Sequence, residues 1–339
     1  MSYSFLRESK LYIVYGGKKY RIYTTSSITF NQTFAEDSYS VKTLHDQSKM
    51  FENSSITKPN PASFNFDVPL TLEKEESIVI DLISDLVAKT GDPDSSASDR
   101  HDHDDTVIAP KQLKSFDIYV QTGSTTFKLE SAIITSANFD FIPGNQFTVR
   151  IEGQGTKLSR AGDESFTIPG SAVSGSFWGD TTKPYHQLGS RTRTPLIVYP
   201  VITIDSLNMT SIVSVNLQLQ NSVNWSPFET LHDSLSVTNS SNAMFPTTYT
   251  LDKRTISGEV RQYQTDNNIT QFDDFSTNSD MILKAVQVGK AHDATPFFQI
   301  QLNPVMYTAR MDPGDVYTQS YDYRSLQNTA VSTQITQYS

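Results

Sequence analysis

Hydrophobic and polar residues alternate in two segments that lie far apart in the chain. In segment 28–34, Ile28, Phe30 and Phe34 alternate with threonine and asparagine, and in segment 213–220 valine and leucine alternate with serine, asparagine and glutamine. A period of two places one set of side chains on a core face and the other toward solvent or a partner. The two segments therefore predict two β-strands, each with one buried face.

Further strands are predicted around these two. Segments 64–70 and 256–260 carry the same alternation. A Pro-Gly pair at 143–144 separates the apolar segments 133–141 and 147–151, and a second Pro-Gly pair at 313–314 separates 305–311 and 316–323. Pro-Gly favours a tight turn, so both regions are predicted to be β-hairpins.

One segment breaks the period of two. Between residues 75 and 89, apolar residues recur as pairs four positions apart, beginning at Ile78-Val79, and two glutamates stand in the first turn. This spacing predicts an amphipathic helix, whose dipole favours acids at its start. A counterpart helix is expected over 274–285, where Met281, Ile282 and Leu283 form a shorter apolar group.

These elements occur in the same order twice. The tetrapeptide Thr-Leu-His-Asp at 43–46 recurs at 230–233, a shift of 187 residues, and the later matches are shifted by 192 and then 170. Repeats of this kind decide the architecture of a chain. The predicted fold class is a β-rich α+β protein with two tandem copies of a sandwich or barrel unit, each with one flanking helix.

The repeat sets the expected domain boundaries. The first domain spans 1–158 and contains an acidic loop insertion at 91–110, because the first copy is longer by 192 − 170 = 22 residues. Loops accept insertions at little entropic cost. A linker follows at 159–194, the second domain spans 195–327, and a polar C-terminal tail spans 328–339.

Long polar connections follow the first strand of each copy, at 43–61 and 230–250. Connections of that length inside a compact domain are uncommon unless they bind something. Both copies keep the connection, which favours a role in assembly. We therefore expect contacts between assembled molecules in these loops, at Thr43, His45, Phe51, Thr230, His232 and Phe245.

Composition narrows the functional classes. The formal net charge is −10, and no basic patch of the kind that grips DNA phosphates stands out. The chain has no cysteine, which excludes disulfides and thiolate metal sites. The first residues lack the pattern of a signal peptide, and no apolar run approaches the length of a membrane span. We expect a soluble protein made in a cytoplasm.

The candidate chemical motifs are few. His101 and His103 stand among aspartates and are the best metal candidates, with a solvated acidic loop as the alternative. The His-Asp pairs at 45–46 and 232–233 resemble acid–base dyads, but adjacent residues of a strand point to opposite faces, which favours a structural role. No phosphate-binding loop or nucleophile elbow occurs. The chain is predicted to be no enzyme and to need no cofactor.

Taken together, the strands, the long polar loop, the middle strands, the helix and the Pro-Gly hairpin resemble the tail tube proteins of long-tailed bacteriophages. The resemblance covers residues 6–158 and 195–327. A chain with two copies resembles the siphophage type, in which three subunits form one pseudo-hexameric ring. The resemblance implies rings stacked into a hollow tube in the virion tail, assembled in the host cytoplasm.

The resemblance also implies partners. These are further copies of the chain, a tape measure protein, and tail terminator and tip proteins, with no membrane anchor. DNA would pass through the lumen without specific binding, because an acidic wall would repel its phosphates. Three alternatives stay open: a tail-tip or baseplate tube component of the same fold, a carbohydrate-binding or depolymerising β-protein, and a surface-adhesion module of two β-sandwiches.

Overall fold

The computed structural model describes most of the chain. The described residues are 9–24, 28–42, 50–70, 74–84, 86–88, 111–142, 144–172, 196–204, 207–225, 245–246, 248–266, 268, 279–289, 296, 298–325 and 334–337. Within these residues the fold is almost entirely β-sheet, with 21 strands and one helix.

The first half of the chain contains the helix and thirteen strands. Their bounds are β1 (Lys10–Tyr15), β2 (Lys18–Ile22), β3 (Thr29–Asn31), β4 (Phe34–Lys42), β5 (Met50–Pro59), β6 (Ala62–Pro69), α1 (Lys74–Ser84), β7 (Leu86–Ala88), β8 (Lys111–Leu113), β9 (Phe116–Gln121), β10 (Thr125–Phe141), β11 (Thr148–Gly155), β12 (Lys157–Asp163) and β13 (Ser171–Ala172).

The second half contains eight strands. Their bounds are β14 (Val198–Ile204), β15 (Leu207–Asn208), β16 (Ile212–Trp225), β17 (Tyr249–Tyr263), β18 (Ser279–Gln287), β19 (Phe298–Asp312), β20 (Thr318–Ser325) and β21 (Gln334–Gln337).

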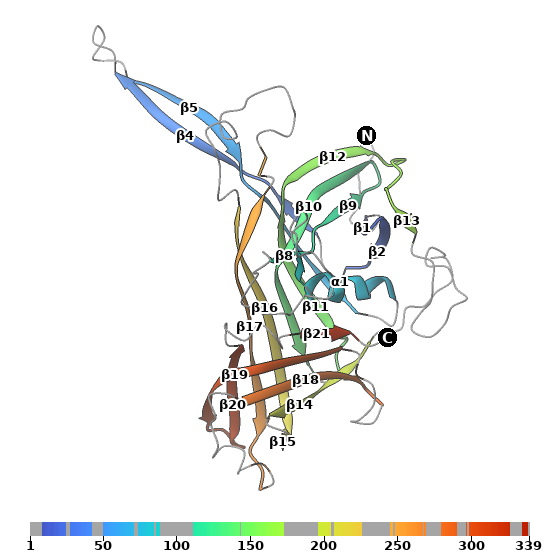
Figure 1. Ribbon diagram of the computed structural model, residues 1–339, viewed down its shortest axis with the longest axis vertical. Helices are drawn as coiled ribbons and strands as arrows, with labels where there is room; N and C mark the ends of the chain where they lie inside the picture. The colour runs from blue at the N-terminus through green and yellow to red at the C-terminus, as the bar shows by residue number, and fades with distance from the viewer. Residues whose placement is uncertain are drawn as a thin grey trace.

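One long antiparallel sheet runs through both halves. Its strand order is β3–β6–β11–β10–β16–β17–β20–β19. The long strands β16 and β17 run down the middle of the molecule in Figure 1 and join the first half to the second. One face of this sheet is apolar and buried, as the alternation predicted. Its largest fully buried side chains include Phe66, Phe139, Phe141 and Ile151.

A second sheet covers the buried face in the first half. Its order is β13–β2–β1–β9–β10–β12, so β10 belongs to both sheets. The register of β10 shifts between Leu129 and Ala132, and Ser131 has a positive φ of 48°. Such a bulge bends the strand. Strand β10 can therefore pass from one sheet to the other and enclose the core between them.

Helix α1 packs against β2 and β10. It buries Ile78, Val79, Leu82 and Ile83, the pairs that the sequence places four residues apart. Lys114, only 5% exposed, donates to the Asp81 backbone oxygen at 2.8 Å and to its carboxylate at 3.0 Å. The predicted helix in the first half is thus confirmed, and it ends at Ser84 rather than at residue 89.

The described residues of the second half form strands. Strand β14 pairs with β15 and β18, and β18 pairs with β19. The helix expected over 274–285 is wrong for its described part, because residues 279–285 belong to β18. Met281, Leu283 and Ala285 are buried while the residues between them are half-buried. That period of two arises because β18 lies between two strands and buries one face.

Both predicted hairpins are confirmed. Strands β10 and β11 pair antiparallel, and so do β19 and β20. In the first turn Gly144 has a φ of 79°, a left-handed conformation that glycine adopts at little cost. In this turn the Asn145 backbone N–H donates to the Ile142 oxygen at 3.1 Å.

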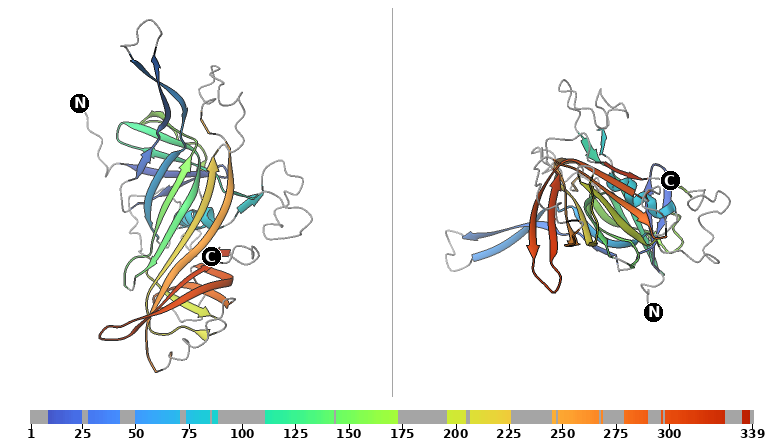
Figure 2. Two further views of the ribbon diagram at one scale, coloured as in Figure 1. Left: turned by 90° about the vertical axis from the view of Figure 1, so that its left-hand side faces the viewer. Right: turned by 90° about the horizontal axis from the view of Figure 1, so that it is seen from below.

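The connection predicted over 43–61 is shorter than expected. Residues 50–59 form β5, which pairs with β4 as a two-stranded ribbon. Figure 1 and Figure 2 show this ribbon projecting from the body of the molecule. The sequence hid the strand, because segment 50–59 is mostly polar and shows no sustained alternation of apolar and polar residues. Most of the second connection, 230–250, lies outside the described residues.

The predicted linker and tail each contribute strands. Strand β12 continues to Asp163 beside β10, and β13 pairs with β2. Strand β21 pairs with the first residues of β19. The domain boundaries stay a prediction, and most of segment 159–194 and the acidic insertion 91–110 lie outside the described residues.

Candidate functional site

The long sheet has a second face that is polar and open. The alternation that buries one set of side chains directs the other set outward from all eight strands. We call this surface the polar face. It includes Thr29, Asn31, Ser63, Asn65, Asp67, Asn138, Asp140, Arg150, Glu152, Asn216, Gln218, Gln220, Ser257, Glu259, Thr308, Arg310 and Asp322.

Side chains of neighbouring strands bind one another across the polar face. Arg150 Nε on β11 lies 3.2 Å from Asp67 Oδ1 on β6. Asn216 Nδ2 on β16 donates to Asn138 Oδ1 on β10 at 2.8 Å, and also to the Asp140 carboxylate. Cross-strand pairs of this kind stabilise a sheet and fix its register.

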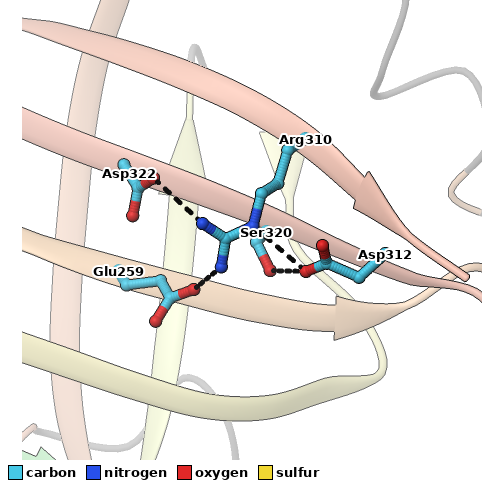
Figure 3. Close-up of polar contacts among 5 residues, drawn as sticks. All are labelled: Glu259, Arg310, Asp312, Ser320 and Asp322. Atoms are coloured by element: carbon cyan, nitrogen blue, oxygen red, sulfur yellow. Dashed lines mark hydrogen bonds and ion pairs between the residues drawn. The ribbon is translucent and has the colours of Figure 1, made fainter.

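Arg310 forms the densest charge cluster on this face. Figure 3 shows its guanidinium group reaching from β19 across β20 toward β17. Its nitrogens lie 3.1 Å from Glu259 Oε1, 3.1 Å from Asp312 Oδ2 and 3.8 Å from Asp322 Oδ2. The hydrogen bond from Arg310 lowers the pKa of the Asp312 carboxyl, to which Ser320 Oγ also donates, and the same pairing raises the pKa of Arg310.

Positive and negative charges on the polar face nearly balance. Its described acids are Asp67, Asp140, Glu152, Glu259, Asp312 and Asp322, and its described bases are Arg150, Lys253, Arg261, Arg310 and Arg324. Six carboxylates thus stand among five basic groups. The net charge of −10 is therefore not concentrated on this face among the described residues.

The two halves meet where β10 pairs with β16. We call this contact the seam: residues 136–141 pair with residues 220–215 in antiparallel register, beginning with Ser136 opposite Gln220. Phe139 and Leu217 face each other on the apolar side, and both are fully buried. Asn221 Nδ2 also donates to the Ile134 backbone oxygen at 2.9 Å. The apolar side chains of the seam are therefore buried as completely as those of the core.

Two edges of the long sheet carry no such partner among the described residues. At one end β3 pairs only with β6. At the other end, β20 covers one side of β19, and no strand covers the other side of residues 306–312. We call residues 28–33 the β3 edge and residues 306–311 the β19 edge. Unpaired edges invite pairing with another chain.

The apolar side of both edges is incompletely buried. Ile28 and Phe30 on the β3 edge, and Tyr307 and Ala309 on the β19 edge, are only partly buried against the core. Met311 is 42% exposed. Side chains at the seam on the same face are buried, so the edges lack a neighbour that the seam has.

A glycine faces an aromatic ring in each half. In the first half Gly153 on β11 lies opposite Phe64 on β6, and in the second half Gly258 on β17 lies opposite Tyr323 on β20. A Cβ atom added to either glycine would overlap the facing ring and a backbone oxygen. Such aromatic–glycine pairs fix strand register, because the ring fills the space over the glycine.

The structure describes two of the six predicted contact residues, Phe51 and Phe245. Phe245 is described, and Lys157 Nζ lies 5.0 Å from the centre of its ring. Phe51 lies on β5, where the backbone pairing alone is described. The other predicted contacts, Thr43, His45, Thr230 and His232, lie outside the described residues. Their role in assembly stays a prediction.

The metal candidates His101 and His103 also lie outside the described residues. In the part of the chain that the structure describes, no three histidine or carboxylate side chains are grouped to hold a metal ion. Nor does any described helix have the length and apolarity needed to cross a membrane.

Comparison with protein families identifies the kind of protein that the first half resembles. Residues 1–152 match the Bacteriophage Baseplate Tube Protein Family. Over these residues the chain is similar to phage baseplate tube proteins. The matched segment contains β3, β6 and β10 and ends within β11, so it holds the first-half strands of the long sheet. None of the curated proteins matches the chain.

The match concerns a structural family and not an enzyme family. Over residues 1–152 this tube-like protein is similar to a component of the phage tail or baseplate in the virion. Among the described residues, the surfaces that the structure offers include a polar face and two uncovered strand edges. The sequence predicted both segments to be strands, but it did not predict that they lie at the two ends of the sheet.

Proposed function

We propose that this tube-like protein is a subunit of the tube at the baseplate or tail tip of a bacteriophage. Three copies would close into a ring of six equivalent halves. The proposal departs from the main tail tube expected from the sequence, because the matched family is named for the baseplate tube. The observation that carries it is the recurrence of one strand arrangement in both halves.

The strand pairings support a duplicated chain. In the first half β1 pairs with β2 and β9, β9 pairs with β10, and the order β3–β6–β11–β10 follows. In the second half β14 pairs with β15 and β18, β18 pairs with β19, and the order β16–β17–β20–β19 follows. Strands β12 and β21 also correspond, each beside the first part of the hairpin strand.

The registers support the same conclusion residue by residue. Shifts of 172 for β10 and 170 for β11 carry the opposite pair Ala137 and Ile151 onto Ala309 and Tyr321, which also lie opposite each other. Phe30 lies opposite Phe64 in the first half. A shift of 187 carries Phe30 onto Leu217 and a shift of 194 carries Phe64 onto Gly258, and these two residues also lie opposite each other. The same shifts of 194 for β6 and 170 for β11 carry the opposite pair Phe66 and Ile151 onto the opposite pair Val260 and Tyr321. One set of shifts thus accounts for three strand pairs: 187 for β3, 194 for β6, 170 for β11 and 172 for β10. The sequence led us to expect 192 for β6 and 170 for β10.

The polar face is the proposed wall of the lumen. It is the open face of a sheet that spans both halves, its described charges nearly balance, and its bases Arg150 and Arg310 are paired with carboxylates of the same face. DNA would therefore slide without a fixed binding site. We propose a wall whose positive and negative charges nearly balance, where the sequence led us to expect an acidic one. The partners of the protein in the tail would be further tube and baseplate proteins.

The test is the mass and shape of the assembled protein. The full chain is concentrated and examined by native mass spectrometry and by negative-stain electron microscopy. We expect particles of three chains whose end views show six similar lobes around a hole. A particle of six chains, or a chain that stays monomeric at every concentration, would contradict the proposal.

A further inference from the structure

The β1–β2 hairpin carries a positive charge that the rest of the described chain does not neutralise. Residues 9–24 contain four bases and no acid, in a chain whose net charge is −10. Lys10 and Lys18 are exposed, and Lys19 and Arg21 are half-buried. None of the four forms an ion pair with a described carboxylate, and Lys19 Nζ donates to the Ile168 backbone oxygen at 3.3 Å. We call the surface formed by Lys10, Tyr12, Lys18, Lys19, Arg21 and Tyr23 the basic hairpin.

The basic hairpin faces away from the core. Tyr12 on β1 lies opposite Arg21 on β2, while Leu11, on the other side of β1, is buried in the core. Arg21 Cζ lies 4.9 Å from the centre of the Tyr23 ring. Tyrosine and arginine are enriched at protein–protein interfaces, so the composition of this surface is typical of a docking site.

The acid on the neighbouring strand is already bound. Asp117 lies on β9, the strand beside β1. Lys128 Nζ lies 3.2 Å from its carboxylate, and the Ser131 backbone N–H donates to it at 2.9 Å. On the other side of the hairpin, β13 contains no charged residue. The charge of the basic hairpin is therefore available to a group from another molecule.

The second half has no such surface. A shift of 189 relates β1 and β2 to β14 and β15, and carries the opposite pair Tyr15 and Lys18 onto the opposite pair Ile204 and Leu207. At the positions of the four bases the second half has the uncharged residues Tyr199, Leu207, Asn208 and Thr210. The same strand pairing thus forms without the charge, which favours a role of the charge in binding rather than in folding.

We propose that the basic hairpin binds an extended acidic segment of a partner protein, with carboxylates on every second residue. Lys19 and Arg21 stand two residues apart on one side of β2, a spacing of about 7 Å that an extended segment repeats. Lysine and arginine bind carboxylates through charge-assisted hydrogen bonds, and the rings of Tyr12 and Tyr23 offer apolar area beside them. This inference goes beyond the proposed function and does not require a ring.

The position of the basic hairpin separates it from the polar face. Strands β1 and β2 belong to the second sheet, which covers the buried face of the long sheet, so the core lies between the two surfaces. Figure 1 shows β1 and β2 on the side of the molecule away from β16 and β17. In the proposed tube DNA in the lumen would not reach the basic hairpin, and proteins outside the tube would. Because each chain has one basic hairpin, a ring of three chains would bind three acidic segments although it has six halves.

The test uses a fluorescein-labelled octapeptide of alternating glutamate and serine, titrated with the full chain and followed by fluorescence anisotropy. We expect one peptide bound per chain, and binding that weakens by about tenfold or more when the salt is raised from about 0.05 M to about 0.3 M. Lys10→Gln with Arg21→Gln should weaken binding by about tenfold or more. The matched control is Lys253→Gln with Arg324→Gln on the polar face, which should bind like the natural chain. Both variants change the net charge to −10 − 2 = −12.

Equal losses in the two variants would show that only the net charge matters and would overturn the inference, as would the absence of peptide binding by the natural chain. Melting temperatures check that the variants fold, and Lys18→Gln with Lys19→Gln replaces the first variant if that one does not. Binding to phosphatidylglycerol vesicles through the same bases, without binding to the peptide, would assign the basic hairpin to a membrane and overturn the protein partner.

Failure of the inference can be told apart from failure of the proposed function. Peptide binding by a chain that forms no rings would overturn the proposed function and leave the inference. Rings that do not bind the peptide, formed by a chain that binds it as a monomer, would show that the basic hairpin is covered by a neighbouring copy. That result would overturn the inference and leave the ring.

Discussion

The seam and the free edges present the same kind of strand in two conditions. At the seam β10 of the first half is covered by β16, whereas at the far end of the sheet β19 of the second half is bare among the described residues. Covering a strand buries its apolar side chains completely, as Phe139 shows, and leaving it bare exposes them, as Met311 shows. The difference teaches that an uncovered strand edge can be recognised by comparison with a covered strand of the same sheet.

The largest expected effect separates the seam from an edge. Phe139→Ala removes a fully buried ring, so we expect it to lower the free energy of unfolding of the monomer by about 3–5 kcal/mol. Phe30→Ala, at the partly buried β3 edge, should cost about 1–2 kcal/mol in the monomer. Urea unfolding below the assembly concentration measures both, and equal losses would contradict the comparison.

The next effect concerns the aromatic–glycine pairs. Gly258→Ala places a Cβ atom against the Tyr323 ring and the Asn216 backbone oxygen, and should cost about 2–4 kcal/mol. Gly153→Ala should cost a similar amount against Phe64 in the first half. The control is Gly314→Ala, whose Cβ would meet only the Val316 oxygen at 3.3 Å and should cost less than about 1 kcal/mol. A costly control would show that glycine is needed for backbone freedom alone.

Alkaline pH should weaken the second half. Burial raises the pKa of Tyr321 and of Tyr249 from 10.0 to about 12, and raises that of Tyr323 further. Because the folded-state pKa exceeds the unfolded value, this stability is fully present below pH 10 and is lost as the pH rises through about 12. Melting temperatures between pH 8 and 12 should fall, and less steeply for Tyr321→Phe. The exposed Tyr317→Phe is the control, and an equal slope in both variants would refute the explanation.

The smallest effect is expected at the Arg310 cluster. Arg310 and its partners are largely open to solvent, where ion pairs contribute little and are screened by salt. Arg310→Gln should leave the melting temperature at 0.15 M salt within experimental scatter and lower it slightly at low salt. Because the pKa of Asp312 is lowered by Arg310, the small contribution is present above the ordinary pKa of an aspartate and is lost as the pH falls through the lowered value. A large loss at high salt would show that the cluster holds β19 in place.

Local patterns predicted the elements that bury one face. Strand β16, both Pro-Gly hairpins and helix α1 follow from periods of two and of 3.6 in their own residues. Strand β18 was taken for a helix because Met281, Ile282 and Leu283 are consecutive, and a short apolar run does not distinguish the two structures. Strand β5 was missed because the polar β4–β5 ribbon has no apolar period.

The candidate site could be predicted only in part, for a different reason. The polar residues of the polar face are visible in the sequence as the second half of each alternation. Whether a strand such as β19 ends the sheet or lies inside it depends on which neighbour pairs with it, and that neighbour is distant in sequence. The seam therefore had to be seen before its open counterparts could be identified.

The aromatic–glycine pairs have a consequence for how such a chain can change through recombination. The ring stands on β6 in the first half and on β20 in the second, so the two halves place ring and glycine on opposite members of corresponding strand pairs. A crossover between these strands would bring Phe64 against Tyr323, or Gly153 against Gly258. In the first hybrid two rings compete for the space of one, and in the second hybrid no ring fills that space. We therefore expect hybrids joined between these strands to be less stable than the natural chain.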